Sequence, residues 1–143
     1  MKGMHCIKFW SKTQASIVTS TAEAGLVALV KGVSEAKGVA NLMKDITGED
    51  PGRVGAYIDA SAAIGIVQRQ GTGKVRHIEV GMLWIQQNQK NGEVQVGKVD
   101  GKTNPADMFT KHIPAEVMWK HMNAMGFENR EGRAEAAVKL VSV

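Results

Sequence analysis

The chain consists of short segments that are either apolar or alternate between apolar and polar residues. Turns that contain glycine or proline separate these segments. Residues 54–58 form a compact strand candidate, and residues 93–99 alternate polar and apolar positions as a half-buried strand does. Residues 4–10 mix β-forming residues with polar ones. The pattern therefore predicts three strands, over residues 4–10, 54–58 and 93–99.

Helical periodicity fills the stretches between these strands. Leu26, Val30 and Val33 recur at helical spacing. Ser20 and Glu23 have the spacing of a capping box, in which each side chain bonds the other's exposed backbone N–H, so a helix is expected to begin there. Helices are predicted over residues 20–45, 61–68, 75–89, 104–110 and 114–125.

The order of these elements indicates the fold class. Gly48–Gly52, which contains Pro51, and Asn91–Gly92 are predicted turns. Strands separated by helices imply an α/β sheet with helices packed on its faces. A chain of 143 residues has the common size of one compact domain, and no internal repeat is present.

Charge and cysteine content narrow the class of protein. The net charge of +4 is spread over both halves of the chain, so it does not by itself indicate a nucleic-acid-binding patch. The longest apolar run, Leu26–Val30, is far shorter than a bilayer span, and lysines at 8 and 12 argue against a secretory signal. The single cysteine, Cys6, excludes an intramolecular disulfide and favours a reducing, intracellular compartment.

Two aspartates occupy positions where active sites are often built. Asp59 follows the predicted strand at residues 54–58, at the edge where open α/β sheets bind ligands. Asp107 lies in the first turn of a predicted helix, where unbonded N–H groups favour an anion. Each has a structural alternative, because Asp59 could simply end a strand and Asp107 could simply cap its helix.

Four blocks of sequence resemble the ribonuclease H domain of copia-type LTR retrotransposon polyproteins. The first block, Trp10–Gln14 followed by Ser20–Ala24 with Ala28–Leu29, resembles its strand and first long helix, and the second, Asp59–Ile64, resembles its Asp-Asn-x-Ser-Ala-Ile segment. Arg76–Val80 resembles Lys-His-Ile-Asp-Ile, and Asn104–Lys111 with its following proline resembles Leu-Ala-Asp-Ile-Phe-Thr-Lys-x-x-Pro. The blocks occur in the family's order and cover roughly residues 7–127.

The resemblance implies a fold and a reaction. The fold would be a ribonuclease H-like mixed sheet with flanking helices, formed by residues 1–127, followed by a tail at 128–143 that could form a loose helix. The reaction would be hydrolysis of the RNA strand of an RNA–DNA hybrid by two Mg²⁺ ions, with Mn²⁺ as a substitute. Asp59 and Asp107 would be catalytic metal ligands with carboxylates within roughly 8 Å of each other, since the two ions lie about 4 Å apart. Glu23 is a third catalytic candidate.

The implied partners are the RNA–DNA hybrid and the upstream reverse transcriptase segment of the polyprotein, with no membrane. The protein would then reside in the cytoplasm or a retroelement particle, or in the nucleus. Phosphates dominate such contacts, so cations should line the groove. The candidate cations are Lys12, Arg69, Lys74, Arg76 and Lys111, although a solvated loop also accounts for the three at 69–76.

The chain departs from the family pattern in two places. It has no acidic residue before Glu23, where the family has a metal-binding Asp on an opening strand, so the chain is expected to begin inside the domain. Gly25 stands where the family's first long helix has a glutamate ligand. Glu23 does not project where residue 25 would, because two residues along a helix are about 200° apart around the axis, and the capping box is the structural alternative for Glu23.

These departures leave the activity open. Hydrolysis is expected to be impaired or absent in this chain alone. The first alternative is a catalytically inactive retroelement relic that binds nucleic acid or a protein partner through the same fold. The second is an unrelated α/β protein whose blocks match by chance.

Overall fold

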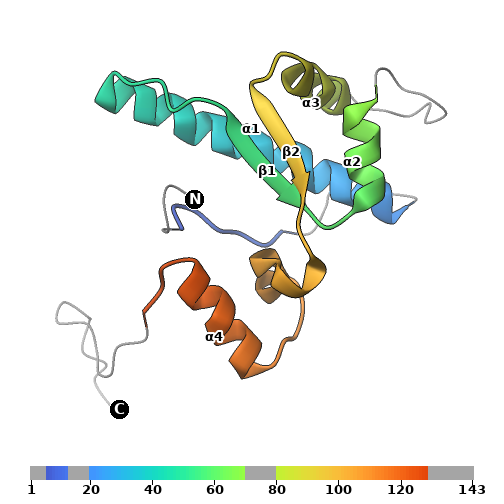
Figure 1. Ribbon diagram of the computed structural model, residues 1–143, viewed down its shortest axis with the longest axis vertical. Helices are drawn as coiled ribbons and strands as arrows, with labels where there is room; N and C mark the ends of the chain where they lie inside the picture. Colours follow the sequence, from blue (N-terminus) through green and yellow to red (C-terminus); the bar gives the residue numbers. More distant parts are fainter. Residues whose placement is uncertain (1–5, 13–19, 70–79, 129–143) are drawn as a thin grey trace, which may run out of the picture. The chain divides into compact units, whose positions relative to one another are not determined.

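The computed structural model describes residues 6–12, 20–69 and 80–128 (Figure 1). The chain divides into two compact units. The larger unit comprises residues 12–104, and the smaller comprises residues 1–11 together with 105–143. The candidate strands at 54–58 and 93–99, and the helices around them, belong to the larger unit.

The longest element is α1 (Thr21–Thr47), which begins where the capping pair predicts. The Ser20 hydroxyl accepts a hydrogen bond from the Glu23 N–H at 3.2 Å. The helix runs two residues past the predicted end, because the chain leaves the helical conformation only at Gly48. That residue has a φ of +71°, and its N–H donates to the Lys44 carbonyl at 2.8 Å.

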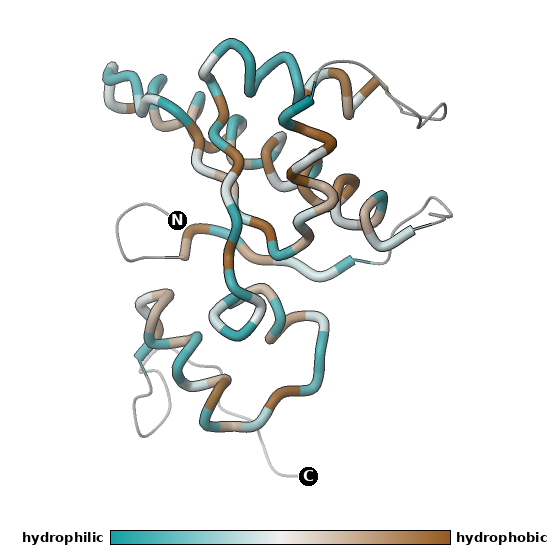
Figure 2. The backbone as a smooth tube through the Cα atoms, turned by 45° about the vertical axis from the view of Figure 1, so that its right-hand side comes forward, coloured by the Kyte–Doolittle hydropathy of each residue, from teal (hydrophilic) through white to brown (hydrophobic). Residues whose placement is uncertain are grey.

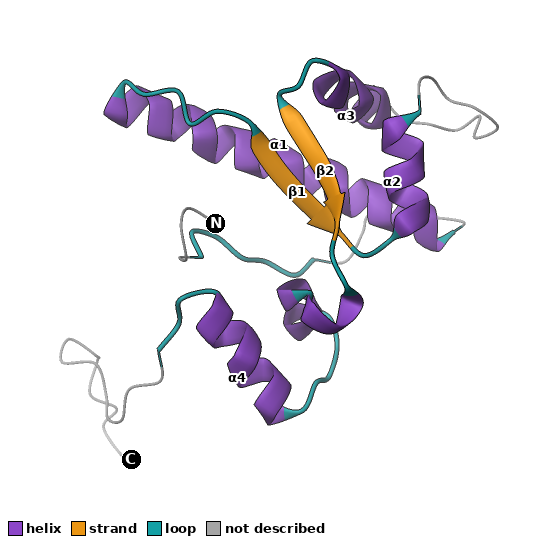
Figure 3. Ribbon diagram, in the orientation of Figure 1, coloured by secondary structure: helices purple, strands orange, loops and turns teal. Residues whose placement is uncertain are grey.

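The sheet confirms the predicted α/β class in its simplest form (Figure 3). Strands β1 (Val54–Ile58) and β2 (Val94–Lys98) pair in parallel, with Val54 opposite Val94 and Ile58 opposite Lys98. The connection between them contains α2 (Ser61–Gln68) and α3 (Val80–Lys90). Parallel neighbours need such a crossover, since a short turn cannot return the chain to the same end of the sheet.

The core of the larger unit lies between one face of this sheet and the three helices. Its buried residues are Leu26, Leu29, Val33, Ala63, Ile66, Val67, Met82, Ile85, Val94 and Val96. In Figure 2 the turns at Gly48–Gly52 and Asn91–Gly92 are hydrophilic, whereas apolar positions recur along the elements between them. The alternation of polar and apolar residues predicted over residues 93–99 is confirmed in β2, because Val94 and Val96 are buried while Gln95 is exposed.

In the residues of the smaller unit that the structure describes there are two short helices, η2 (Pro105–Phe109) and α4 (Ala115–Ala124). η2 is a 3₁₀ helix, so the helix predicted over 104–110 is present but shorter and tighter. α4 matches the helix predicted over 114–125, and the chain turns after it at Gly126, whose φ is +79°.

The strand predicted over residues 4–10 is wrong for the part that the structure describes. Residues 6–10 form no strand. Within the smaller unit, the Cys6 N–H donates to the Met125 carbonyl at 3.0 Å, and the ring of Phe9 stacks on that of Phe109 with centroids 5.1 Å apart. A β-forming composition needs a neighbouring strand, and here the segment packs by its aromatic ring instead.

Other predictions fall wholly or partly on positions that the structure does not describe. The helix predicted over 75–89 is present from Val80 onward, and residues 75–79 lie outside the described ranges. The tail at 129–143 also lies outside them. Within the described ranges, no helix has the length and apolar character needed to cross a membrane.

Candidate active site

The two strands end together, and this edge carries the first predicted site residue. Ile58 and Lys98 are register partners at the last positions of β1 and β2, and the Val99 N–H donates to the Ile58 carbonyl at 3.1 Å. Asp59 follows directly in the chain. The structure thus places Asp59 at the carboxyl edge of a parallel sheet, where α/β folds bind their ligands.

The Asp59 side chain is exposed and lies beside a glycine. A Cβ atom built on Gly101 would stand 3.9 Å from Asp59 Oδ2, so this glycine leaves open space next to the carboxylate. Among the described residues, the Asp59 carboxylate forms neither a hydrogen bond nor an ion pair. Its negative charge is therefore available to a cation from solution.

Sequence reasoning missed two polar residues at the same edge. Lys98 Nζ donates to the Ser61 hydroxyl at 2.6 Å. Ser61 begins α2, two residues after Asp59, and Lys98 ends β2. The pair is separated by 37 positions in sequence, and only the parallel register brings the two side chains together.

Gly25, at the family's glutamate position, packs against the segment that carries Asp59. A Cβ atom on Gly25 would stand 3.0 Å from the Ala60 Cβ and 3.3 Å from Ile58 Cδ1. A contact of 3.0 Å is tighter than nine in ten real Cβ contacts, so this glycine allows α1 to approach the end of β1 closely. Position 25 is therefore a close-packing position.

The second predicted metal ligand, Asp107, is already paired with a cation. Its Oδ2 lies 2.8 Å from Lys111 Nζ, and its side chain is only 19% exposed. The Lys111 N–H also donates to the Asp107 carbonyl at 2.8 Å, so both groups are held on one turn of chain. Any metal ion at Asp107 must compete with this ammonium group.

The candidate residues are divided between the two units. Asp59 and Glu23 belong to the larger unit, and Asp107 and Lys111 belong to the smaller. The predicted approach of the Asp59 and Asp107 carboxylates therefore stays a prediction. In the ranges that the structure describes, no three His, Cys, Asp or Glu side chains gather in a group that could hold a metal ion.

The remaining candidate cations have different surroundings. Lys12 is exposed. Arg69 lines a cavity of about 400 Å³ between the C-terminal parts of α2 and α3. Lys74 and Arg76 lie outside the described residues. Lys111, as shown above, forms an ion pair with Asp107.

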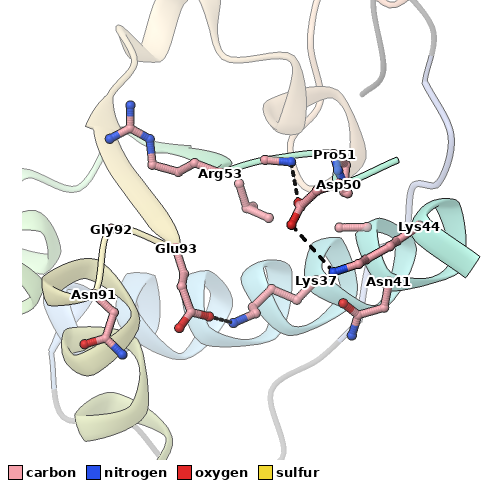
Figure 4. Close-up of a pocket in the computed structure, with 12 residues that line it drawn as sticks. Lys37, Asn41, Lys44, Asp50, Pro51, Arg53, Asn91, Gly92 and Glu93 are labelled. Carbon is pink, nitrogen blue, oxygen red and sulfur yellow. Dashed lines mark hydrogen bonds and ion pairs between the residues drawn. The ribbon is translucent and has the colours of Figure 1, made fainter. Parts of the chain in front are cut away.

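The opposite edge of the sheet holds a cavity of about 410 Å³, shown in Figure 4. The Lys37 ammonium on α1 donates hydrogen bonds to Glu93 and Asn88. Lys44 Nζ lies 3.6 Å from Asp50 Oδ2. The pKa of Glu93 lies below its usual range. The main cause is the hydrogen bond from Lys37, and a hydrogen bond from Asn91 and the positive charge of Lys37 act in the same direction.

A similar arrangement surrounds Asp50 in this cavity. The Gly52 N–H donates to its carboxylate at 2.9 Å, and this bond, aided by the charge of Lys44, lowers the pKa of Asp50. The carboxylates here are thus matched by lysines of α1. These ion pairs hold α1 to the starts of the two strands, and they leave little net charge in the cavity to attract a ligand.

Comparison with known proteins gives one match. No family model and no solved structure matches the chain. The chain is similar to a retrotransposon Pol polyprotein. It is 28% identical over 109 residues, or 76% of its length, to the Retrovirus-related Pol polyprotein from transposon TNT 1-94 of Nicotiana tabacum. The matched stretch spans 8% of that polyprotein, so the relation concerns a small part of it.

Proposed function

We propose that this chain is a ribonuclease H-like segment of a copia-type retrotransposon Pol polyprotein, which binds RNA–DNA hybrids and hydrolyses their RNA strand poorly. The observation that carries the proposal is the position of Asp59. It follows β1 at the carboxyl edge of the parallel sheet, is exposed, and has no cation bound to it among the described residues. The similarity to a Pol polyprotein supports the same conclusion.

The donor chemistry fits Mg²⁺ in part. Carboxylate oxygens are the hard ligands that Mg²⁺ prefers, and Asp59 offers them to solvent. When bound, a pair of such ions activates water and stabilises the leaving oxygen. Asp107 would be the second ligand, and it fits only if its ion pair with Lys111 opens.

The number of carboxylates explains why hydrolysis should be slow. Two Mg²⁺ ions about 4 Å apart repel strongly, even at a moderate effective dielectric constant. The matched ligands Asp59 and Asp107 are two carboxylates, and Gly25 offers no third one, with close packing around its Cα that a larger side chain would have to displace. Losing a few kcal/mol of transition-state stabilisation lowers the rate by roughly two to three orders of magnitude.

A labelled RNA–DNA hybrid, incubated with the purified full chain in Mg²⁺ and in Mn²⁺, tests the proposal. We expect detectable binding that weakens with salt, and slow cleavage confined to the RNA strand. Asp59→Asn should abolish the residual cleavage. The matched control is Asp45→Asn, an exposed carboxylate on α1, which should cleave as the unmodified chain does.

Two other results would be decisive. Cleavage that survives Asp59→Asn would show that Asp59 is not a ligand. Absence of any binding at low salt would overturn the nucleic-acid role itself.

The alternative is a catalytically inactive relic that binds nucleic acid. Two observations favour it specifically, namely the close packing at Gly25 and the ion pair at Asp107. Hybrid binding without cleavage in either metal, at any protein concentration, would select this alternative.

A further inference from the structure

Lys98 differs from four other lysines of the described residues in the kind of group that it contacts. Lys31, Lys37, Lys44 and Lys111 each form an ion pair with a carboxylate. The ammonium of Lys98 instead donates to a neutral hydroxyl, and its charge is not neutralised by any carboxylate that the structure describes.

Lys98 and Ser61 together present hydrogen-bond donors for which the described residues supply no acceptor. A lysine ammonium has three N–H donors, of which one is directed at Ser61 Oγ. The Ser61 hydroxyl accepts that bond and keeps its own O–H, for which the described part of the chain supplies no acceptor. Such a set of donors, with one positive charge, is complementary to the oxygens of an anion.

Asp59 lies at the same edge without cancelling this charge. Ile58, its neighbour in the chain, is the register partner of Lys98, and Ser61 is two residues further on. Even so, the Lys98 ammonium and the Asp59 carboxylate form no ion pair. A negatively charged and a positively charged side chain thus both come from the carboxyl edge of the sheet without pairing with each other.

We infer that Lys98 and Ser61 bind a phosphate of a nucleic-acid backbone beside Asp59. The choice of a nucleic-acid phosphate as the anion rests on the proposed function. The donor pair itself rests on the 2.6 Å contact and the strand register. Lys98 contacts a non-bridging oxygen in this arrangement, and Ser61 directs the ammonium and donates its own O–H.

The test measures binding of a fluorescein-labelled RNA–DNA hybrid to the full chain in EDTA, at several KCl concentrations. Without metal, the readout does not depend on Asp59 or on cleavage. Lys98→Gln should weaken binding roughly 3- to 10-fold at low salt and reduce the slope of log K against log salt by about one, because one phosphate contact is lost.

Matched variants separate this site from a general effect of charge. Lys31→Gln removes the same charge from the exposed side of α1 and should leave the slope unchanged. Lys98→Arg should retain binding, which also covers the case in which the Gln variant folds poorly. Ser61→Ala should weaken binding to a lesser extent, and should add little in the Lys98→Gln background, since both residues serve one phosphate.

The outcomes distinguish this inference from the proposed function. If Lys98→Gln binds the hybrid with the affinity and salt slope of the unmodified chain, or if Lys31→Gln loses as much, the phosphate site is wrong while the ribonuclease proposal stands. If Lys98→Gln weakens binding and no variant cleaves RNA, the phosphate site stands without catalysis. If the unmodified chain does not bind the hybrid, both are overturned.

Discussion

Gly25 shows how one residue controls the approach of two elements. Its missing side chain lets α1 approach the Ile58–Ala63 segment, where a Cβ would lie 3.0 Å from the Ala60 Cβ. Gly32 lies in the same helix, and a Cβ there would meet nothing within 4 Å. The two glycines therefore share a helical context and differ only in their tertiary surroundings.

We expect substitution by alanine to stabilise the fold at Gly32 but not at Gly25. Gly32→Ala should raise the free energy of unfolding by about 0.5–1 kcal/mol through helix propensity. Gly25→Ala has the same propensity gain but adds an overpacked methyl group that costs about 1–3 kcal/mol, so it should be neutral or destabilising. Urea unfolding of both variants checks this, and equal stabilisation would show that α1 does not lie close to Ala60.

At the scale of elements, ion pairs on one side of α1 hold it to the starts of the strands. Lys37 reaches Glu93 just before β2, and Lys44 reaches Asp50 in the turn before β1. Both carboxylates are exposed, and both have a pKa lowered in the folded state. Their contribution to stability is accordingly modest and depends on pH and on salt.

The sign of the pH dependence follows from the direction of these shifts. A carboxylate with a lowered pKa in the fold stabilises it fully above the unfolded value of about 4, and loses this effect as pH falls through the folded value. The free energy of unfolding should therefore decrease as the pH is lowered from 6 towards 3. Glu93→Gln should flatten this decrease, whereas Glu49→Gln, an exposed control with no ion pair among the described residues, should not.

At the scale of the whole molecule, the two predicted metal ligands belong to different compact units. Asp59 lies in the larger unit and Asp107 in the smaller. If both bind one Mn²⁺ site, then Asp59→Asn and Asp107→Asn should each weaken Mn²⁺ binding several-fold in calorimetry. The double variant should lose little more than either single one, because residues that act on one ligand are not additive.

Lys111→Gln offers an independent check on the same site. It removes the ammonium that lies 2.8 Å from the Asp107 carboxylate, so Mn²⁺ affinity should rise. Additive losses in the double Asp variant would instead indicate that the two aspartates bind metal separately.

Several features of this protein were predictable because they depend on neighbours within a turn or two of chain. The bounds of β1 and α2, the cap at Ser20 and the turn at Gly92 follow from local periodicity and from residue types that favour one backbone conformation. The position of Asp59 at the strand end follows in the same way. The ion pair between Asp107 and Lys111 also has a local signal, since residues four apart on a helical turn face each other.

Other features were decided only by the tertiary structure. The Lys98–Ser61 contact spans 37 positions and depends on the parallel register of β1 and β2. Gly25 meets Ala60 across a similar separation, through the packing of α1 against the end of β1. Residues 6–10 have the composition of a strand and yet form none, because a strand needs a partner that composition does not specify. Periodicity specifies which face of an element is apolar, whereas the neighbour that covers that face is chosen by contacts between distant parts of the chain.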